Sequence, residues 1–564
     1  MKWGMAAAFV AACLVFGIGV HEPNTSRQAV IALAALALLI AANRKTWTVG
    51  PVGLTLFSCL GVYGLGLLWS SDWREGFNAL VLMLPFVVIF LVLSRADGWA
   101  ERVPVLTGVS VVGAFALWHW LPEIEGGFGN PNFVAEFFLI ALPLVMGGLT
   151  RKTGVVVRVF LAAAVGIGVW FLVFDSTSKA KYFALIPVVA VAIYRLRGHT
   201  WGLAGVIAAT IAGGLAAWSW KGQAIASSVL ARAELVINTG ALWLQSPMFG
   251  NGSGSFNHDY SKVQETHLSF LTNYSVLGDI TTFAGTAHNE VVQTLAEHGI
   301  VGLVAVGLLL VALLRHWLSK KREPIDNWAM ASLGMALWLS LIGFPLHNAH
   351  TGLLAVVAAA IVARGERAWL ATSGANPIPA YLGVGTGLAL VVATGLIYAG
   401  QFKLTETRIA INNAPLMAFK ANVAAYDYWP FDQLTRRQLI LSLTKLTTHY
   451  GDRVELHPGA ADRAYRISAS ASPYSPATQV ARLEYLMYSG RLNQEEAERI
   501  LSSLKITASR HPLTWLADAL YAAGMGDTSR VHASLETMTT RTAVSDVHGR
   551  FAERVLTLLK ENTK

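Results

Sequence analysis

Long apolar runs follow one another along the first 400 residues and restrict the chain to a membrane fold. A helix needs roughly 17–25 mostly apolar residues to cross the hydrocarbon core, and its backbone groups must bond within the segment. Only 14% of the residues are charged, whereas soluble domains carry about 25%. The sequence therefore predicts an all-α fold, a polytopic membrane helix bundle of about 13 spans. The spans lie near 3–20, 28–43, 50–69, 78–94, 103–121, 132–149, 155–174, 181–195, 201–219, 299–316, 329–345, 347–363 and 378–399.

The connections between the spans differ in their Lys and Arg content. One alternate set holds NRKT, SRADGWAER, TRKTGVVVR, YRLRGH, RHWLSKKRE and ARGER, and the other set is less basic. Because short cytoplasmic loops collect Lys and Arg, we assign the basic set and the N-terminus to the cytoplasm. The long loop 220–298 then lies outside, and an odd number of spans places residues 401–564 outside as well. The same bias accounts for the net charge of +9, so no nucleic-acid partner is predicted.

Residues 401–564 have a soluble composition and form a second domain after the transmembrane domain 1–400. Gly490 and Gly524 lie 34 residues apart, which is the period of tetratricopeptide helix pairs. The segments ATQVARLEYLMY and QEEAERILSSL between these marks have apolar residues at helical spacing. We expect two or three antiparallel helix pairs, stacked into a short α-solenoid of the tetratricopeptide-like kind.

A long polar stretch, centred on the loop 220–298, interrupts the apolar runs. Irregular backbone cannot lie in hydrocarbon, so this loop must lie outside the bilayer core and is the expected place for chemistry. His288 opens the segment HNEVVQTLAEHG, a candidate helix for which Gly285 and Thr286 are possible start signals. Histidine is the side chain suited to act as a base near neutral pH, although one of fifteen histidines can equally be an ordinary surface residue.

Basic side chains near the outer surface are the second group of candidates. Lys179 and Lys181 lie at the outer end of the eighth predicted span, and Arg232 and Glu234 lie in the loop. The lysines have two interpretations, which are snorkelling to lipid phosphates and clamping an anionic head group such as a diphosphate. The run GNGSGSF is a tight loop, but it lacks the lysine and the following helix of a phosphate-binding P-loop.

No metal or other cofactor is predicted. His258, His267 and His288 are irregularly spaced, and His347 with His350 forms only a loose pair.

Several motifs together resemble the O-antigen ligase/polymerase superfamily, which includes O-antigen ligases, O-antigen polymerases and bacterial protein O-oligosaccharyltransferases. The matching order is an arginine, then P-x-F-G-x-G-x-G-x-F with a following Tyr, then H-N-x-x-(V/L)-Q-x-L-A-E-x-G-I-x-G-L at a span. A GNPN turn before the sixth span and FPLHNAHTG before the twelfth also match. The family usually has a Ser-Arg-Gly-like motif at the outer end of the eighth span, where this chain has Ser178-Lys-Ala-Lys181.

The resemblance implies a metal-independent inverting glycosyltransferase of the GT-C type in the bacterial inner membrane, with the C-terminal domain in the periplasm. The donor would be a glycan on undecaprenyl diphosphate, with His288 as catalytic base and with Arg232, Lys179 and Lys181 binding the diphosphate. The remaining residues of the matched motifs would support the site. They are Asn130, Asn132, Gly250, Gly252, Tyr260, Asn289, Glu297 and Gly299.

The acceptor stays open among lipid A-core for a ligase, a lipid-linked repeat for a polymerase, and a protein Ser or Thr for an oligosaccharyltransferase. A ligase-like transferase is the leading expectation. A helical solenoid offers a concave surface for a protein partner, which keeps a protein acceptor close behind. The competing classes are a transporter with the loop as a lid, and a membrane-anchored scaffold. The scarcity of charged residues in the predicted spans argues against the transporter.

Overall fold

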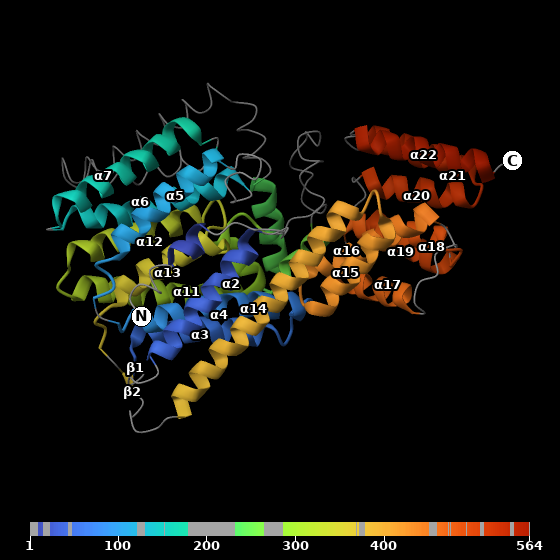
Figure 1. The fold of residues 1–564 in the computed structure, drawn as a ribbon. Coiled ribbons are helices and arrows are strands. Elements are labelled where there is room, and N and C mark those ends of the chain that lie inside the picture. The colour runs from blue at the N-terminus through green and yellow to red at the C-terminus, as the bar shows by residue number, and fades with distance from the viewer. Residues whose placement is uncertain are drawn as a thin grey trace.

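The computed structural model describes most of the chain, and the regular secondary structure of those parts is helical apart from one pair of two-residue strands. The described residues are 9–14, 23–42, 48–96, 98–120, 130–151, 153–176, 178, 232–263, 286–367, 369–371, 378–450, 459–471, 473, 475–491, 493–507, 512–541 and 546–562. The strands β1 (Thr48–Val49) and β2 (Leu370–Ala371) pair antiparallel, with Thr48 opposite Ala371. Figure 1 shows the membrane bundle and the C-terminal helices side by side.

The helices of the bundle follow the predicted apolar runs. They are α2 (Pro23–Ala42), α3 (Pro51–Gly66), α4 (Trp73–Leu93), α5 (Val103–Trp120), α6 (Pro131–Leu149), α7 (Val155–Trp170) with the π-helical turn η2 (Phe171–Asp175), α11 (Glu290–Ser319), α12 (Pro324–Leu339), α13 (Ala349–Ala363) and α14 (Ile378–Ala410). Six are long and apolar enough to cross a membrane, namely α4, α5, α6, α7 with η2, α11 and α14. The chain is therefore a multi-pass helical membrane protein. The eighth and ninth predicted spans lie outside the described residues, so the number thirteen stays a prediction.

The core of the bundle surrounds α13. Thirteen of its fifteen residues are buried, and eight of these are Ala, Gly or Val. Small side chains let neighbouring helices approach closely, which is the usual way in which helices pack within membranes. Helix α13 packs against α4, α6, α11 and α12, and α5, α6 and α7 pack against one another on one side. This arrangement holds α4, α6 and α11 in fixed positions around the polar segments at one end of the bundle.

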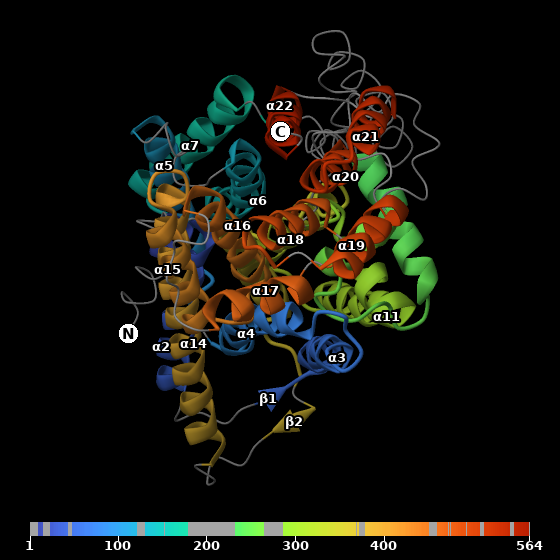
Figure 2. The same cartoon turned by 90° about the vertical axis from the view of Figure 1, so that its right-hand side faces the viewer.

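Helix α14 connects the bundle to the C-terminal region. Its 33 residues correspond to about 50 Å at 1.5 Å per residue, well beyond the roughly 30 Å of the hydrocarbon core. It packs against α2 and α4 at the bundle and against α15 (Pro415–Tyr428) beyond it. The remaining helices are α16 (Gln433–Tyr450), α17 (Ala460–Ala471), α18 (Pro476–Tyr488), α19 (Gln494–Thr507), α20 (Pro512–Gly524), α21 (Thr528–Arg541) and α22 (Asp546–Asn562). Figure 2 shows them stacked one after another.

A repeated unit recurs in this stack with a spacing different from the predicted one. Helices α18 and α20 both begin with a proline, Pro476 and Pro512, which lie 36 residues apart. The glycines with positive φ after these helices are Gly490 (φ 65°) and Gly526 (φ 73°), again 36 residues apart. Gly524, which the sequence paired with Gly490, is the last residue of α20 itself. The sequence pattern therefore selected the wrong glycine, because only the backbone conformation identifies the residue that ends the helix.

Candidate active site at the break in helix α11

Helix α11 is interrupted at Gly299, where φ is 62° and ψ is −160°. In an unbroken helix the amides of Ile300 and Val301 would bond the carbonyls four residues earlier. Here Ile300 N donates to Pro247 O at 2.9 Å, and Val301 N donates to Met248 O at 3.1 Å. The polar loop therefore supplies the acceptors that the helix lacks at its break.

The same loop also supplies donors to the carbonyls that the break releases. The Ala296 carbonyl accepts from Asn251 N at 2.8 Å and from Asn251 Nδ2 at 3.0 Å. The Glu297 carbonyl accepts from Gly252 N at 2.9 Å. The carbonyls of Ala296 and Glu297 and the amides of Ile300 and Val301 are thus paired, as a broken helix within a membrane domain requires. The loop 246–252 and the motif around Gly299 form one structural unit.

The glycines of the loop are required by close backbone approaches. A Cβ on Gly250 would lie 2.3 Å from the Glu297 carbonyl carbon, and one on Gly252 would lie 2.4 Å from Ser70 Cα. Both glycines have positive φ, at 70° and 96°. The amide of Gly252 is bonded to the broken helix, so it does not form a phosphate cradle. We therefore assign the two predicted motif glycines to the support of α11.

The start of α11 differs from the predicted one. The helix begins at Glu290 with Asn289 as N-cap, and Thr286 lies before it in irregular backbone, while Gly285 lies outside the described residues. Asn289 Oδ1 accepts from Val292 N at 3.1 Å, and Asn289 Nδ2 donates to Leu341 O at 2.9 Å. Asn289 therefore both caps the helix and ties it to the segment that follows α12.

Glu290 extends this connection. Its carboxylate accepts from Leu346 N at 2.9 Å and from Ser340 Oγ at 3.2 Å. His347 Nδ1 lies 3.4 Å from Glu290 Oε1. The residues between α12 and α13, part of the FPLHNAHTG motif, are thus fixed against the first turn of α11. The negative charge also suits the helix N-terminus.

His288 has a strained backbone and a largely buried ring. Its φ of 50° is the only positive value at a non-glycine residue in the described part of the chain. This conformation costs about 1–3 kcal/mol and persists only where the surroundings impose it. The ring packs edge-on against Phe344, with centroids 4.8 Å apart. Burial, together with the nearby positive charge of Arg232, lowers the pKa of His288 from 6.5 to about 4. The imidazole is therefore neutral at physiological pH.

Arg232 lies in the helix that the described residues 232–245 form, and it comes close to His288 from a distant part of the sequence. Burial lowers the pKa of Arg232, and the negative charge of Glu136 in α6 opposes that effect. Glu136 accepts a hydrogen bond of 3.5 Å from Asn348 Nδ2. Among the residues that the structure describes, no carboxylate oxygen lies within 4.0 Å of the Arg232 guanidinium. A partly desolvated cation without a contact ion pair thus lies beside a neutral histidine.

Other predicted site residues have structural roles. Tyr260, in α10 (Phe256–Val263), is buried, packs on Phe256 and accepts a 3.2 Å hydrogen bond from Asn238. Asn130 caps α6 by accepting from Asn132 N at 2.8 Å. Glu234 is buried, and burial raises its pKa to about 7.

Two further predicted site residues, Lys179 and Lys181, lie outside the described residues, so their proximity to Arg232 stays a prediction. Among the described residues no three His, Cys, Asp or Glu side chains lie close enough together to hold a metal ion.

Sequence reasoning missed Glu136, Glu290 and Glu75 as parts of this region. Glu290 stood inside the quoted segment HNEVVQTLAEHG, but its partners Ser340, Leu346 and His347 lie in a distant segment. Glu136 lies in an apolar span, where an ionisable residue is itself a signal of function. Glu75 had no signal, because its partners come from the start of α16, more than 350 residues later in the chain.

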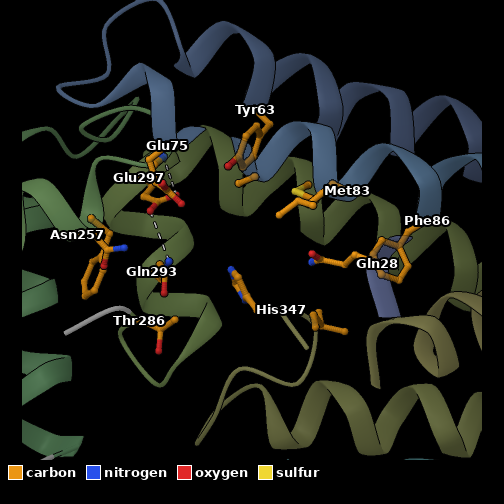
Figure 3. Close-up of a pocket in the computed structure, with 15 residues that line it drawn as sticks. Gln28, Tyr63, Glu75, Met83, Phe86, Asn257, Thr286, Gln293, Glu297 and His347 are labelled. Atoms are coloured by element: carbon orange, nitrogen blue, oxygen red, sulfur yellow. Dashed lines mark hydrogen bonds between the residues drawn. The ribbon is translucent and has the colours of Figure 1, made fainter. Parts of the chain in front are cut away.

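A cavity of about 320 Å³, lined by both apolar and polar side chains, lies next to this cluster between α3, α4 and α11. Figure 3 shows Tyr63, Glu75, Glu297, Gln293, Gln28 and His347 around it, with Met83 and Phe86 on the α4 side. Glu297 Oε2 accepts from Gly254 N at 3.4 Å, and Glu297 Oε1 accepts from Gln293 Nε2 at 3.5 Å. The predicted motif residue Glu297 therefore lies in the wall of this cavity.

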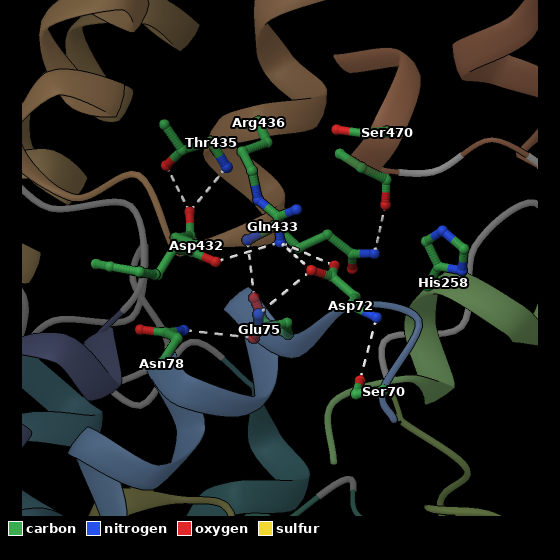
Figure 4. Close-up of polar contacts among 12 residues, drawn as sticks. Ser70, Asp72, Glu75, Asn78, His258, Asp432, Gln433, Thr435, Arg436 and Ser470 are labelled. Carbon is green, nitrogen blue, oxygen red and sulfur yellow. Dashed lines mark hydrogen bonds and ion pairs between the residues drawn. The ribbon is translucent and has the colours of Figure 1, made fainter. Parts of the chain in front are cut away.

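A buried ion pair joins the C-terminal region to the bundle beside the cavity (Figure 4). Arg436 Nη2 donates to both carboxylate oxygens of Asp72, at 2.9 and 2.8 Å, and both side chains are 2% exposed. Asp72 also caps α4 by accepting from Glu75 N at 3.4 Å. Removing one charge of such a pair leaves the other buried and unpaired, so the two regions depend on each other here.

Glu75 connects the same junction to the cavity, because it lines the cavity and is bonded to the C-terminal region. Glu75 Oε2 accepts from Gln433 N at 2.8 Å, and Glu75 Oε1 accepts from Asn78 Nδ2 at 3.3 Å. Trp429 Nε1 donates to Asn78 Oδ1 at 2.8 Å. A carboxylate that lines the cavity is thus held by backbone and side chains on both sides of the junction.

The fold and the site define a helical multi-pass membrane protein with a neutral histidine and a desolvated arginine at one end of its bundle. Comparisons with protein family models, with curated proteins and with solved structures find no match to the chain.

Proposed function

We propose that the protein is an inner-membrane glycosyltransferase that moves a glycan from undecaprenyl diphosphate to an acceptor hydroxyl, in the manner of an O-antigen ligase. The observation that carries the proposal is the neutral, strained His288 beside Arg232, a desolvated cation with no contact ion pair in the described part of the chain. We place this activity in a GT-C-like bundle of thirteen spans with a tetratricopeptide-like periplasmic domain.

His288 would act as the general base. Its neutral ring nitrogen accepts the proton of the acceptor hydroxyl while the oxygen attacks the anomeric carbon. The new C–O bond forms on the face opposite the breaking bond to the diphosphate, so the anomeric configuration inverts. Arg232, together with Lys179 and Lys181, would stabilise the charge of the departing lipid diphosphate. No metal takes part in these steps.

The bound diphosphate would also improve the base. The positive charge of Arg232 is one cause of the low pKa of His288. An anion bound at Arg232 offsets that charge and raises the pKa of His288 again. The histidine would then be a stronger base when the donor is bound than in its absence, which limits unproductive proton uptake.

Two acceptors other than lipid A-core fit the same chemistry, a lipid-linked glycan repeat and a protein Ser or Thr. The stack α15–α22 next to the site favours a protein acceptor or another protein partner, since helical stacks offer extended binding surfaces.

A membrane transporter is the alternative of a different class, and one observation favours it. Arg27, Glu136 and His350 are almost completely buried in α2, α6 and α13. Buried ionisable groups inside a bundle are typical of substrate and proton pathways. The scarcity of charged residues in the predicted spans is therefore weaker evidence against a transporter than the sequence suggested. Uptake of labelled lipid-linked glycan into vesicles, without transfer to any acceptor, would favour the transporter.

The test of the transferase is to mix purified protein with a lipid-linked glycan and candidate acceptors, and to identify by mass spectrometry which acceptor gains the glycan. His288→Ala should abolish turnover, and Arg232→Ala should lower it by about 10²–10³-fold or more. The matched controls are His532→Ala and Arg499→Ala, at exposed positions of α21 and α19. Near-normal turnover of the His288 variant would exclude it as the base, and reversible loss of activity in EDTA would exclude the metal-free mechanism.

The lysines are tested separately, because residues two apart in a helix point about 200° apart. Lys179→Ala and Lys181→Ala should therefore differ in activity. Equal and negligible effects would favour lipid snorkelling.

The proposed periplasmic placement of the loop 220–298 and of the C-terminal region is tested with cysteines at Ser261 and Ser529. Both should react with an impermeant thiol reagent in spheroplasts. Labelling of only one of them would contradict it.

A further inference from the structure

We propose that the cavity between α3, α4 and α11 binds an uncharged or amino-bearing sugar unit, and that it excludes anionic sugars. The inference deepens the proposed function, on which it rests, because it names the class of sugar that the site accepts. It depends on the chemical character of the lining side chains and on which of their polar groups are already bonded.

The cavity has the size and composition of a small-ligand site. Its volume of about 320 Å³ lies at the lower end of the roughly 300–1,000 Å³ of ligand pockets. Leu82, Met83 and Phe86 form an apolar wall on α4. Polar side chains face them from α3, α11 and the first turn of α4 (Figure 3). One apolar wall with polar groups opposite suits a ring that has an apolar face and hydroxyl groups at its edge.

Two carboxyl groups, those of Glu75 and Glu297, determine which polar groups the cavity accepts. The hydrogen bonds of Glu75 and Glu297 come from N–H donors, which are Gln433 N, the Asn78 side chain, Gly254 N and the Gln293 side chain. A carboxylate has about four acceptor positions on its two oxygens. The positions that remain suit hydroxyl or ammonium donors, whereas a ligand carboxylate, which only accepts hydrogen bonds, would lack a donor there.

Tyr63 and Gln28 supply polar side-chain groups that form no hydrogen bond to other described residues. Both line the cavity, and no hydrogen bond joins the Tyr63 hydroxyl or the Gln28 amide to another described residue. Figure 3 shows both side chains directed toward the space between α4 and His347. A hydroxyl and an amide can each donate and accept, so they complement sugar hydroxyls.

The cavity adjoins the His288 cluster but is separate from Arg232. Thr286 and His347 are among its lining residues, whereas Arg232 is not. The Arg232 cation, which suits a diphosphate, and the carboxyl groups of Glu75 and Glu297, which suit donor groups, thus belong to different parts of the site. This separation would orient a substrate with its sugar toward Glu75 and Glu297 and its phosphate toward Arg232.

The test is saturation-transfer NMR on the purified full-length protein with three probes, methyl glucoside, methyl glucosaminide and methyl glucuronide. The first two should bind at millimolar concentrations, and the glucuronide should not. Gln28→Leu and Tyr63→Phe should each weaken binding by about three- to tenfold, as expected for one lost hydrogen bond. Tyr428→Phe, at an exposed position of α15, is the matched control. Glu297→Gln should allow the glucuronide to bind.

Three results would overturn the proposal. They are equal binding of all three probes, no binding of the two uncharged or amino-bearing probes, and unchanged binding in both the Gln28 and the Tyr63 variants. The measurement needs no donor lipid and can be made with the His288→Ala protein. Sugar binding by the wild-type protein without transfer activity would reject the proposed transferase and keep the cavity assignment. Transfer activity without sugar binding would reject the cavity alone.

Discussion

The pKa of His288 offers the most direct test of the site geometry, because it depends on burial and on one neighbouring charge. The fall from 6.5 to about 4 corresponds to about 3.4 kcal/mol at roughly 1.4 kcal/mol per pKa unit. Burial is the larger cause and Arg232 the smaller. Arg232→Gln should therefore raise the pKa of His288 by less than half of this gap, which is less than about 1.7 kcal/mol.

The assay is the pH dependence of modification by diethyl pyrocarbonate, which reacts with the neutral imidazole, read at His288 by mass spectrometry. In the wild-type protein the reaction should continue at its full rate well below pH 6.5. The inflection of the Arg232→Gln variant should lie higher but still below 6.5. N-acetylhistidine in the same buffer serves as the reference. An inflection near 6.5 in the wild-type protein would show that the ring is not desolvated, and an unchanged inflection in the variant would show that Arg232 is not near it.

The same pKa predicts a pH dependence of stability with a definite sign. Because the pKa of His288 is lower in the folded protein than in the unfolded chain, the folded state is not penalised above pH 6.5. Stability is then lost as the pH falls from 6.5 toward 4, by up to about 3.4 kcal/mol from this residue. His288→Gln should remove that part of the acid sensitivity in thermal unfolding scans.

Three further predictions concern stability. Arg436→Met alone should weaken the attachment of the C-terminal region by about 3–5 kcal/mol, measured as faster release of that region by trypsin. Adding Asp72→Asn should restore most of the attachment. Equal release from the wild-type protein, the single variant and the double variant would contradict a buried pair. Gly299→Ala should lower the melting temperature, because its φ is 62° and the strain costs about 1–3 kcal/mol, whereas Gly307→Ala in the same helix should not. Asn289→Ala should cost about 1 kcal/mol as a lost N-cap, and Asn289→Ser should recover part of it; no difference between them would argue against the cap.

The sequence predicted the helices of the bundle well, because a continuous apolar run long enough to cross a bilayer has few other stable conformations. The tenth span shows the limit of that reasoning. Hydropathy placed its start at residue 299, whereas α11 begins at Glu290 and is broken at Gly299. The polar part of α11 before the break, residues 290–298, is held by the loop 246–252 and by the segment between α12 and α13. Hydropathy cannot reveal such support, because it depends on contacts between distant segments.

The candidate site was predicted only in part, again because some of its contacts join distant segments of the chain. His288 and Arg232 were singled out, and the structure brings them together. The positions of Glu136 near Arg232, and of Glu75 beside Gln433, follow only from the packing of α6 and α16 against distant segments. In the C-terminal region the wrong glycine was chosen, because Gly524 and Gly526 are equally plausible helix ends in the sequence and differ only in backbone conformation.

Contacts with residues 70–72 show that the polar loop and the C-terminal region lie on the same side of the membrane, without a need to count the spans between them. Ser70 and Ser71, just before α4, donate hydrogen bonds to Ser253 O and Asp259 of the loop, both at 2.8 Å. The next residue, Asp72, binds Arg436. The loop and the start of α16 must therefore lie on the same face of a membrane, since neither can reach α4 through the bilayer. An even number of crossings between them is required, and α11 and α14 are both long and apolar enough to cross a membrane. The C-terminal region thus borders the cavity directly, because Gln433 N donates to Glu75, one of the residues that line it.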